Sequence, residues 1–566
     1  MAISNSFAGA LPQRDRQRGL RAVELSLLFS AFLTGFYNHR FWQILLDNSP
    51  TDSLSGLAFV AAGFVFIALW LSLFVHLTSV RGVFKPLLII LLLIATSADY
   101  FTQRYGVIID KSMIQNVMQT DSAEATELVS GDMLLHLLLY FVLPGAVIIW
   151  IPIRRQSFRQ ELLQRVLVYV LSIALMGGLF LAFNKDFTFL FRQHPELRSL
   201  ITPTYPIHAT IKYFRERNAA PRVRAVIGAD ARRVNADEER KTLFVLVVGE
   251  TARAQNFGLN GYARDTTPEL AKMDVVNYRH TESCGTSTAE SLPCIFSHLG
   301  REDYVSSEAG GYDNLIDIVE RAGIPSLWID NQAGCKGVCE RFEHINTKYL
   351  DDPKLCPDGE CHDEIMTRVL DEQLFQKPDR APSDHFIVLH QMGSHGPAYY
   401  RRIPDEFRRF TPECRSVNLQ ECSPESVVNS YDNTILYTDH VLAELIRLLA
   451  SHQDQYDIAL YFASDHGESL GENGLYLHGM PYLFAPEQQT RVPAILWLSD
   501  QFKRDRGLTD PCLKAHENDR YSHDNIFHTV LGAFGIETEL YNADLDMMTR
   551  CRSVDGTGTA EPSTTP

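Results

Sequence analysis

The hydrophobic pattern divides the chain into two unlike parts. Up to about residue 183 long apolar runs dominate, whereas beyond about residue 241 shorter apolar runs alternate with polar segments, as in soluble α/β proteins. Five apolar stretches are each close to the ~20 residues that a membrane-spanning helix needs. They run roughly over residues 23–45, 54–80, 84–101, 133–153 and 166–183. The pattern therefore predicts an N-terminal helical membrane domain of five transmembrane helices in residues 1–183 and a C-terminal α/β domain.

Charged residues in the connections predict the orientation of these spans. Basic residues gather before the first span, between the second and third, and between the fourth and fifth: Arg14, Arg16, Arg18, Arg21, Arg81, Lys85, Arg154, Arg155, Arg159 and Arg165. The other two connections carry the acids Asp47, Asp52, Asp121, Glu124 and Glu127. Because cytoplasmic loops are enriched in lysine and arginine, the N-terminus is predicted to be cytoplasmic, and five spans place the C-terminal domain outside. The first span is the least regular, since Asn38, His39 and Arg40 interrupt it, and it would serve as its own export signal.

Composition narrows the interpretation of the rest of the chain. The formal net charge of −17 argues against a nucleic-acid partner. Residues 184–240 alternate aromatic with basic side chains, which is typical of an amphipathic segment along a membrane surface or of an ordinary linker. Residues 553–566 are rich in glycine, threonine, serine and proline and are predicted to be disordered. The chemistry is therefore expected in residues 241–552.

The ten cysteines all lie in the C-terminal part, between Cys284 and Cys551. An even number confined to the part predicted to lie outside the membrane indicates disulfides and an oxidising compartment. Pairing of neighbours would join Cys284 to Cys294, Cys335 to Cys339, Cys356 to Cys361 and Cys414 to Cys422, leaving Cys512 and Cys551. A structural zinc site is the alternative, but the chain contains no C-x-x-C pair.

Potential metal ligands follow several predicted strands, at the point where each strand ends. Glu250 follows the apolar run 243–248, Asp465 and His466 follow 458–462, and His395 lies just beyond 386–389. In open α/β sheets ligands gather at the carboxyl ends of strands, so we expect these side chains to converge. An adjacent carboxylate and imidazole suit zinc, with Glu468 a supporting residue rather than a ligand. A carboxylate such as Glu250 is also a common helix cap and by itself would not identify a site.

Hydroxyl nucleophiles lie between the first two of these ligand positions, in the segment Cys284-Gly-Thr-Ser-Thr-Ala. Thr288 would lie near the start of a helix, where backbone N–H groups stabilise an alkoxide and a bound phosphate. A metal ion on its oxygen would lower the pKa of the hydroxyl further, and a metal with a hydroxyl nucleophile indicates phosphoryl or sulfuryl transfer. Thr286 competes with Thr288 for this role, and a helix cap is the commonest role of such residues.

Further polar residues at the ends of apolar runs are candidates for substrate binding or a second metal ion. They are His390, His395, His478, Asn331, Gln332 and Lys336. A lone histidine is usually structural, but two in one loop and a third 12 positions beyond His466 indicate a role toward the substrate. Lys336 suits phosphate oxygens, although it can equally be a solvated charge between Cys335 and Cys339.

These motifs, together with the preceding spans, resemble the lipid A phosphoethanolamine transferases, a family that includes the mobile colistin-resistance enzymes. The most specific matches are Gly249-Glu-Thr-Ala-Arg, Cys284-Gly-Thr-Ser-Thr-Ala, Asp330-Asn-Gln-Ala-Gly-Cys-Lys-Gly-Val-Cys, His390-Gln-Met-Gly-Ser-His-Gly-Pro and Ser464-Asp-His-Gly-Glu-Ser. The resemblance covers the chain except its tail and implies an alkaline-phosphatase-like, or sulfatase-like, C-terminal domain with a central sheet flanked by helices. One departure is Ala333, where many relatives have serine, which bears on one hydrogen bond of the pocket and not on the chemistry.

The resemblance also implies a role for each candidate residue. Thr288 is the nucleophile; Glu250, Thr288, Asp465 and His466 bind the catalytic zinc; His395 and His478 bind substrate phosphate or a second zinc; and Thr286, Gln332 and Lys336 line the phosphoethanolamine pocket. It also supports the pairing of Cys284 with Cys294. The implied enzyme is a monomer in the bacterial inner membrane, with a periplasmic catalytic domain, phosphatidylethanolamine as donor and lipid A as acceptor.

The implied reaction consists of two displacements at phosphorus through a phosphoethanolamine-threonine intermediate. Adding the ethanolamine cation to a lipid A phosphate would lower the negative charge of the cell surface and weaken binding of polymyxin. The acceptor is alternatively a lipopolysaccharide core sugar, another glycan or a protein. A phosphodiesterase of the same fold, a sulfatase and a catalytically inactive membrane sensor are further alternatives, but Thr288-Ala-Glu-Ser lacks the Cys/Ser-x-Pro-x-Arg pattern of sulfatases.

Overall fold

The computed structural model describes residues 19–77, 82–120, 125–126, 128–154, 156–219, 223–234, 240–350, 352–357, 360–376 and 382–552. The chain forms two compact units. The first comprises the chain up to Lys111 and Val129–Lys212; the second comprises Ser112–Leu128 and the chain from Tyr213 onward. Several residues used in the sequence interpretation lie outside the described residues: Arg14, Arg16, Arg18, Arg81, Asp121, Glu124, Arg155, Glu127 and the tail 553–566.

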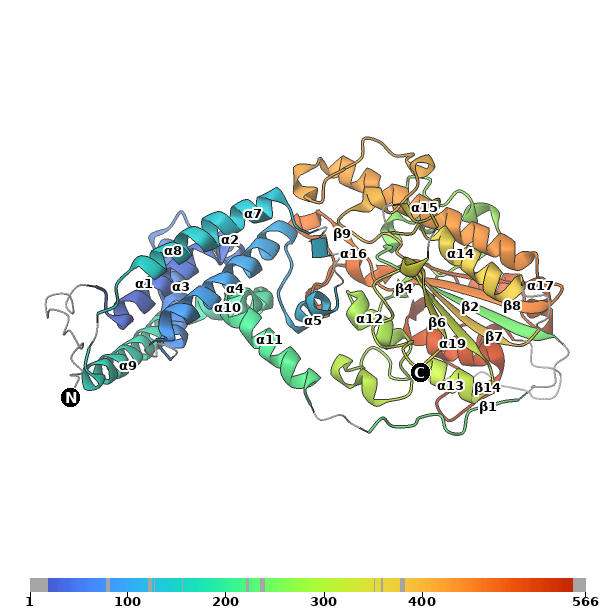
Figure 1. The fold of residues 1–566 in the computed structure, drawn as a ribbon, viewed down its shortest axis with the longest axis horizontal. Helices are drawn as coiled ribbons and strands as arrows, with labels where there is room; N and C mark the ends of the chain where they lie inside the picture. The colour runs from blue at the N-terminus through green and yellow to red at the C-terminus, as the bar shows by residue number, and fades with distance from the viewer. Residues whose placement is uncertain are drawn as a thin grey trace, which may run out of the picture. The chain divides into compact units, whose positions relative to one another are not determined.

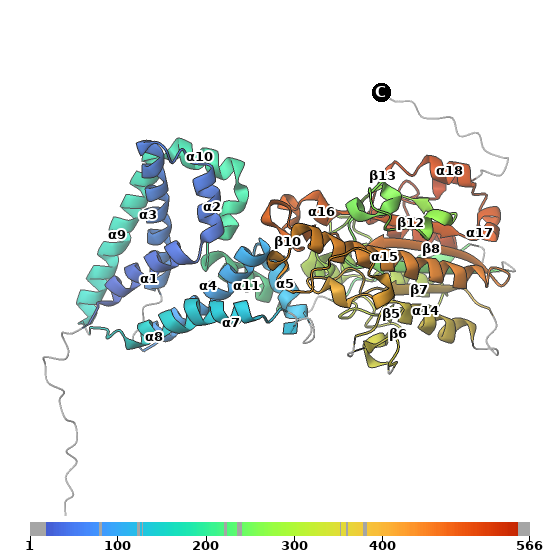
Figure 2. The same cartoon turned by 90° about the horizontal axis from the view of Figure 1, so that it is seen from above.

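The first unit is helical. Its helices are α1 (Ala22–Phe36), α2 (His39–Asp47), α3 (Leu54–Leu77), α4 (Phe84–Tyr105), α7 (Gly131–Leu137), α8 (Leu143–Trp150), α9 (Phe158–Ala182) and α10 (Asn184–Gln193), and most of α11 (Thr204–Arg217). A π-helical turn, Leu138–Val142, joins α7 to α8. Helix α3 packs against α1 and α9, and α4 packs against α7 and α8 (Figure 2).

Four stretches of the described chain are helical, long and apolar enough to cross a membrane. They are α3, α4, Gly131–Trp150 and α9. Many of their large apolar side chains are exposed, among them Trp150, Leu163 and Leu181. Such continuous apolar surface is typical of helices in contact with lipid. In the expected connector, α10 packs into the first unit through buried Phe187, whose ring centroid lies 5.0 Å from that of Phe59.

The first predicted span is divided into two helices. α1 ends at Phe36 and α2 begins at His39, so neither reaches the length of a span. The buried side chain of Asn38 lies at the break, where its amide donates to Leu33 O at 3.0 Å and its Oδ1 accepts from Thr202 N at 2.8 Å. These bonds satisfy the buried amide of Asn38 and connect the break with the main chain at Thr202. The number of five spans therefore stays a prediction.

The second unit is built on a seven-stranded mixed sheet with the order β3-β12-β8-β2-β7-β5-β6. The strands are β2 (Lys241–Gly249), β3 (Val276–Asn277), β5 (Ser326–Asp330), β6 (His344–Asn346), β7 (His385–His390), β8 (Tyr456–Ser464) and β12 (Ala494–Leu498). The strands from β8 to β6 are parallel, and β12 is antiparallel to its neighbours β8 and β3. The parallel strands β2, β7 and β8 are buried on both faces, which explains their continuous apolar runs. The predicted C-terminal α/β domain with a central sheet is confirmed.

Helices cover both faces of this sheet. They include α12 (Thr288–Ile295), α13 (Leu315–Arg321), α14 (Glu364–Leu370), α15 (Pro424–Ala450), α17 (Asp500–Asp505), α18 (Asp510–Ala515) and α19 (Asp524–Phe534). A further short helix of this unit is α16 (Glu487–Thr490). Along β2, Phe244 and its alternate neighbours pack with α12, α13 and α19, whereas Leu243 and its alternate neighbours pack with α14 and α15. Figure 1 shows α14 and α15 on one side of the strands and α13 and α19 on the other. The sheet is thus the middle of three layers.

Smaller sheets shape the loops around the main sheet. β11 (Arg491–Val492), β4 (His280–Glu282) and β13 (Arg520–Ser522) form one sheet with β4 in the middle; β1 (Arg232–Arg233) pairs with β14 (Ile536–Glu537), and β9 (Ser469–Leu470) with β10 (Tyr476–Leu477). β4 is parallel to β13. Because the carboxyl ends of parallel strands meet at the same edge, the segments that follow β4 and β13 begin side by side.

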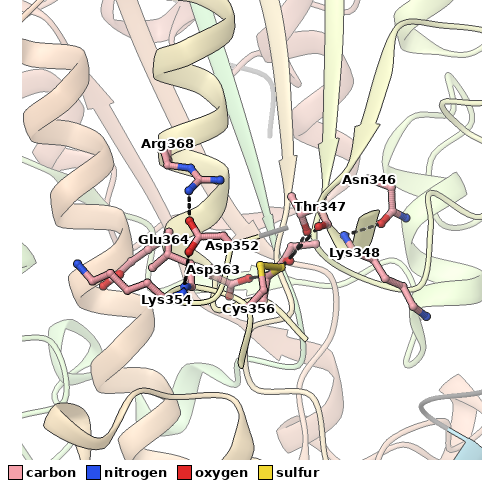
Figure 3. Close-up of a disulfide and its surroundings, with 12 residues drawn as sticks. Asn346, Thr347, Lys348, Asp352, Lys354, Cys356, Asp363, Glu364 and Arg368 are labelled. Carbon is pink, nitrogen blue, oxygen red and sulfur yellow. Dashed lines mark hydrogen bonds and ion pairs between the residues drawn. A yellow bond between two sulfur atoms is a disulfide. The ribbon is translucent and has the colours of Figure 1, made fainter. Parts of the chain in front are cut away.

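All ten cysteines are paired in disulfides, so the expectation of disulfides is confirmed. The bridges join Cys284 to Cys294, Cys335 to Cys339, Cys356 to Cys361, Cys414 to Cys422 and Cys512 to Cys551. Four are the expected neighbour pairs, and the fifth joins the two cysteines left over. Figure 3 shows the bridge at Cys356 with Thr347 and Asp363 nearby.

Candidate active site

Two neighbouring parallel strands place acidic and imidazole side chains at one edge of the main sheet. Glu250 follows β2, and Asp465 and His466 follow β8. Gly249 lies opposite Ser464 in the register, and Asp465 N donates to Gly249 O at 2.8 Å. The side chains of Glu250, Asp465 and His466 are fully buried. The structure thus brings together three of the expected ligands.

These three side chains form a compact cluster, with one ligand atom from each within 4.8 Å of the others. His466 Nε2 lies 3.5 Å from Glu250 Oε1 and 3.4 Å from Asp465 Oδ2. Within the described part of the chain, both of these carboxylate oxygens are buried and have no hydrogen-bond partner. Buried polar atoms are nearly always bonded, so this set of facing, unpartnered oxygens fits a bound cation.

The electrostatics of the cluster also favour a cation. Burial, and then the charge of Asp465, raise the pKa of Glu250 well above its usual range. Burial likewise raises the pKa of Asp465. Burial, and then His478, lower the pKa of His466 well below its usual range, so its imidazole is neutral. A divalent cation stabilises ionised carboxylates and binds neutral imidazole, and this donor set therefore suits it.

Thr288 is the first residue of α12, and its hydroxyl reaches the cluster. Thr288 Oγ1 donates to Glu250 Oε2 at 3.0 Å and lies 3.4 Å from His466 Nε2. Thr286 is held differently, because its hydroxyl donates to Met480 O at 2.6 Å. Of the two hydroxyls, only that of Thr288 is bonded to a carboxylate able to take its proton. The geometry therefore favours Thr288 over Thr286 as a nucleophile.

His478 lies beside this cluster. Its ring centroid is 4.4 Å from that of His466 and 5.9 Å from that of His395. His478 Nδ1 lies 2.9 Å from Glu468 Oε2, and Glu468 Oε1 accepts from the Tyr399 hydroxyl at 2.9 Å. Glu468 is fully buried and orients His478, as carboxylates commonly do around metal sites. The structure thus places His395 and His478 together, with Glu468 behind His478.

His390 belongs to a different pair. Its Nδ1 lies 3.0 Å from Asp330 Oδ2, which also accepts from Trp328 Nε1 at 2.9 Å. Burial alone would raise the pKa of Asp330, but the charge of His390 and its hydrogen bond lower it below the usual value. His390 is fully buried, and its Nε2 has no hydrogen-bond partner among the residues that the structure describes. The structure therefore places His390 at the ends of β5 and β7, outside the three-ligand cluster.

Gln332 and Lys336 border the cluster in different ways. Gln332 Nε2 donates to Glu250 Oε2 at 2.9 Å, so this amide supports the same oxygen as Thr288. Lys336 has a φ of 50°, and its Nζ donates to Ala333 O at 3.4 Å. The charge of Lys336 acts on Glu250 and opposes the rise in the pKa of that carboxyl. Both residues lie where they can influence a group bound at Glu250.

Sequence reasoning missed Asp363, which organises the loop after β7. Its oxygens accept from Asn331 Nδ2 at 2.7 Å, from Met392 N at 2.8 Å and from Gly393 N at 2.9 Å. Gly393 has a φ of 51°, and a Cβ there would lie 2.7 Å from Glu250 O, so only glycine fits. The chain has 69 aspartate and glutamate residues, and no sequence pattern distinguishes Asp363 from the others because it follows no apolar run.

A second missed element comes from between two predicted spans. Helix α5 (Lys111–Gln119) belongs, from Ser112 onward, to the same unit as the sheet. Gln115 Nε2 donates to Ala289 O at 3.1 Å, and Gln115 Oε1 accepts from Ser306 Oγ at 3.1 Å. The Met113 methyl lies 2.8 Å from where a Cβ of Gly479 would be. Helix α5 therefore contacts both the residue after Thr288 and the residue after His478.

The fold and the site define a class of enzyme. A largely parallel sheet with a hydroxyl, two carboxylates and an imidazole at its carboxyl edge is the arrangement expected of the alkaline phosphatase and sulfatase superfamily. Residues 242–536 match the family model described as Sulfatase. Residues 67–218 match the model described as Phosphoethanolamine transferase EptA/EptB.

Individual relatives narrow the class further. The phosphoethanolamine transferase EptA of Escherichia coli (strain K12) is 41% identical over 556 residues, which cover 95% of this chain and 99% of the relative. The phosphatidylethanolamine transferase Mcr-1 of Escherichia coli is 37% identical over 536 residues, 92% of this chain and 96% of the relative. The solved structure of the integral membrane lipooligosaccharide phosphoethanolamine transferase A from Neisseria meningitidis superposes with a TM-score of 0.90 at 34% identity, covering 94% of this chain and 99% of that one. The chain belongs to the EptA and Mcr family of phosphoethanolamine transferases.

Proposed function

We propose that this enzyme transfers phosphoethanolamine from phosphatidylethanolamine to a phosphate of lipid A, with Thr288 as the covalent carrier. The observation that carries the proposal is the hydrogen bond from Thr288 Oγ1 to Glu250 Oε2, at 3.0 Å, within a buried three-ligand cluster. Two relatives support the choice of donor lipid and acceptor lipid. Mcr-1 is a phosphatidylethanolamine transferase, and the Neisseria meningitidis enzyme acts on lipooligosaccharide.

Zinc fits the side chains of this site. Glu250, Asp465 and His466 would hold it, together with the oxygen of Thr288. When bound, the ion would act as a Lewis acid that stabilises the threonine alkoxide and the phosphoryl oxygens. The buried, unpartnered oxygens Glu250 Oε1 and Asp465 Oδ2 are the structural observation in favour of a resident cation.

In the first displacement, Thr288 Oγ1 attacks the phosphorus of phosphatidylethanolamine. Glu250 accepts the hydrogen bond of this hydroxyl and is therefore placed to take its proton. As the new oxygen–phosphorus bond forms, the bond to the glycerol oxygen breaks and diacylglycerol leaves. His478, which Glu468 orients, is placed to give a proton to the leaving oxygen.

In the second displacement, an oxygen of the lipid A phosphate attacks the same phosphorus. The bond from phosphorus to Thr288 breaks, Thr288 takes back the proton held by Glu250, and His478 recovers its proton from the attacking P–OH group. Lys336 and Gln332 would hold phosphate oxygens during both displacements. Gln332 donates a hydrogen bond to Glu250, and the charge of Lys336 acts on the same carboxylate. The product carries an added ethanolamine cation, which lowers the negative charge of the surface and so weakens binding of cationic peptides such as polymyxin.

Both substrates are amphiphiles, which explains why the catalytic fold is attached to membrane helices. The proposed topology has a cytoplasmic N-terminus, five spans and a periplasmic catalytic domain, in a monomer of the bacterial inner membrane. The described basic residues near the predicted cytoplasmic ends of the spans, among them Arg21, Lys85 and Arg154, support this orientation. The five disulfides agree with an oxidising periplasm.

The adduct on Thr288 provides the test. Purified full-length enzyme is incubated with phosphatidylethanolamine labelled in its head group, and the intact mass is measured. We expect one phosphoethanolamine adduct on the wild type and on Thr286→Ala, and none on Thr288→Ala. The adduct should disappear when lipid A is added and should not form after treatment with a chelator. An adduct that persists on Thr288→Ala, or none on the wild type, contradicts the proposal.

The same experiment distinguishes the alternatives. A phosphodiesterase would release free phosphoethanolamine into water without any acceptor. Transfer to a core sugar, another glycan or a protein would leave the adduct intact when lipid A alone is supplied. Mass spectrometry of lipid A from cells with and without the enzyme then identifies the modified phosphate.

A further inference from the structure

A buried histidine outside the expected site contacts both segments that carry the reacting groups. His523 lies between β13 and α19 and is fully buried. In the parallel pair of β13 and β4, Ser522 lies opposite Glu282, and His523 N donates to Glu282 O at 3.0 Å. This pairing brings the side chain of His523 next to Cys284, which begins the segment 284–288, here called the nucleophile segment.

The two ring nitrogens of His523 have different main-chain partners. Cys284 N donates to His523 Nδ1 at 3.0 Å, and His523 Nε2 lies 2.9 Å from Ser464 O. Because an N–H group only donates and a carbonyl only accepts, Nδ1 carries no proton and Nε2 carries one. Burial lowers the pKa of His523 to about 4, which agrees with a neutral ring. Ser464 directly precedes Asp465, so one imidazole connects the nucleophile segment with the ligand segment.

Ser291 makes a second connection between the same segments. It lies on α12, one turn beyond Thr288, and is fully buried. Its Oγ accepts from Gly285 N at 3.2 Å and donates to Asp465 O at 2.5 Å. His523 Nδ1 lies 3.5 Å from this hydroxyl. The two side chains therefore form one network whose outer contacts are all with the main chain.

We propose that His523 is a positioning residue that, together with Ser291, holds Thr288 in register with Asp465 and His466. The inference deepens the proposed function and rests on it. Thr288 comes from a helix and the ligands come from a strand end, so their separation depends on contacts between these segments. A misplacement of a reacting group by about 1 Å can cost on the order of 100-fold in rate. A side chain that contacts both segments would therefore raise the rate by fixing the position of Thr288.

Substitutions that keep one end of the bridge test this role. His523→Asn keeps an acceptor near Cys284 N but loses the donor to Ser464 O, whereas His523→Gln keeps the donor and loses the acceptor. His523→Ala removes both. His528→Asn is the matched control, because His528 is also buried on α19 but accepts from Asn542 N at 3.1 Å. Each variant is made in the full-length chain.

Three measurements separate positioning from simple packing. They are the rate of adduct formation on Thr288 at saturating phosphatidylethanolamine, the KM for that lipid, and hydrogen exchange in peptides that cover residues 283–287 and 463–466. We expect His523→Asn and His523→Gln to slow adduct formation by about 10- to 100-fold with KM unchanged. Hydrogen exchange near Cys284 should rise in His523→Gln and His523→Ala but not in His523→Asn. The control His528→Asn should change neither the rate of adduct formation nor this exchange.

Two results overturn the inference. The first is adduct formation at the wild-type rate in His523→Asn and His523→Gln. The second is unchanged exchange near Cys284 in His523→Ala. If the wild type forms no adduct, the proposed function fails, and the exchange measurement alone then decides whether His523 holds the two segments together.

Discussion

Thr288 Oγ1 and Glu250 Oε2 lie 3.0 Å apart, although 38 residues separate them in the chain. Glu250 directly follows β2, the middle strand of the sheet, and Thr288 begins α12 on one face of that sheet. The hydroxyl is therefore held against a fully buried carboxylate at the end of a central strand. The same oxygen of Glu250 also accepts from Gln332, which leaves Oε1 directed at His466.

Glu250→Gln should abolish metal binding, because it removes one of only two negative charges in the cluster. We expect the zinc content of purified enzyme to fall to near zero and activity to fall by at least about 100-fold. Zinc per chain is measured by elemental mass spectrometry after desalting. Asp439→Asn is the control, since Asp439 is also buried but accepts from the N–H groups of Glu269 and Leu270. Full zinc content in Glu250→Gln would show that this carboxylate is not a ligand.

Glu468→Gln should impair turnover without removing zinc, because Glu468 contacts His478 and Tyr399 rather than the three ligands. The expected fall in kcat is about 10- to 100-fold, the usual effect of losing a carboxylate that orients an imidazole near a metal. Activity and zinc content are measured on the same preparation. Loss of zinc in this variant would mean that Glu468 itself binds the ion.

The stability of the enzyme should fall in mild acid through His523. Its pKa is 6.5 as an ordinary histidine and about 4 in the fold, so between these values the unfolded chain binds more protons. The free energy of unfolding therefore decreases as the pH falls from about 6.5 toward 4, by about 2 kcal/mol for this group between about pH 7 and pH 5. The free energy of unfolding, measured with denaturant at several pH values, should decrease less with falling pH in His523→Asn than in the wild type. An equal dependence on pH in both proteins would contradict a lowered pKa of His523 in the folded state.

The disulfide from Cys512 to Cys551 should contribute more stability than that from Cys335 to Cys339. The first closes a separation of 39 residues and the second a separation of 4. Loop-closure entropy predicts that removing them by paired Cys→Ser substitutions costs about 4 and about 2 kcal/mol respectively. The measurement is denaturant unfolding of the two double variants beside the wild type. The reverse order would show that local strain or residual structure dominates over loop length.

Gln115→Glu should slow adduct formation, although Gln115 lies between two predicted spans in the sequence. The change keeps an acceptor for Ser306 Oγ but removes the donor to Ala289 O, beside Thr288. One net hydrogen bond of about 1 kcal/mol corresponds to about a 5-fold loss in rate. Gln115→Ala, which removes both bonds, should be at least as slow. Wild-type rates in both variants would show that α5 does not support the position of Thr288.

Periodicity and local chemistry were sufficient for the parts of this protein that depend on neighbouring residues. Apolar runs revealed the long membrane helices and the buried strands β2, β7 and β8. A helix surrounded by lipid and a strand buried on both faces both require apolar side chains. Polar residues directly after those strands identified Glu250, Asp465 and His466, since parallel strands end at a common edge. The cysteine spacing indicated four bridges, because short loops bring neighbours together.

Contacts between distant segments decided the rest. The break at Asn38 depends on a partner at Thr202, and Asp363, His523 and Gln115 act on segments far from them in the chain. None of these residues carries a periodic signal, because each is defined by a partner that only folding supplies. The pattern of the chain thus specifies which elements form, and packing of those elements specifies which single side chains hold Thr288 close to Glu250, Asp465 and His466.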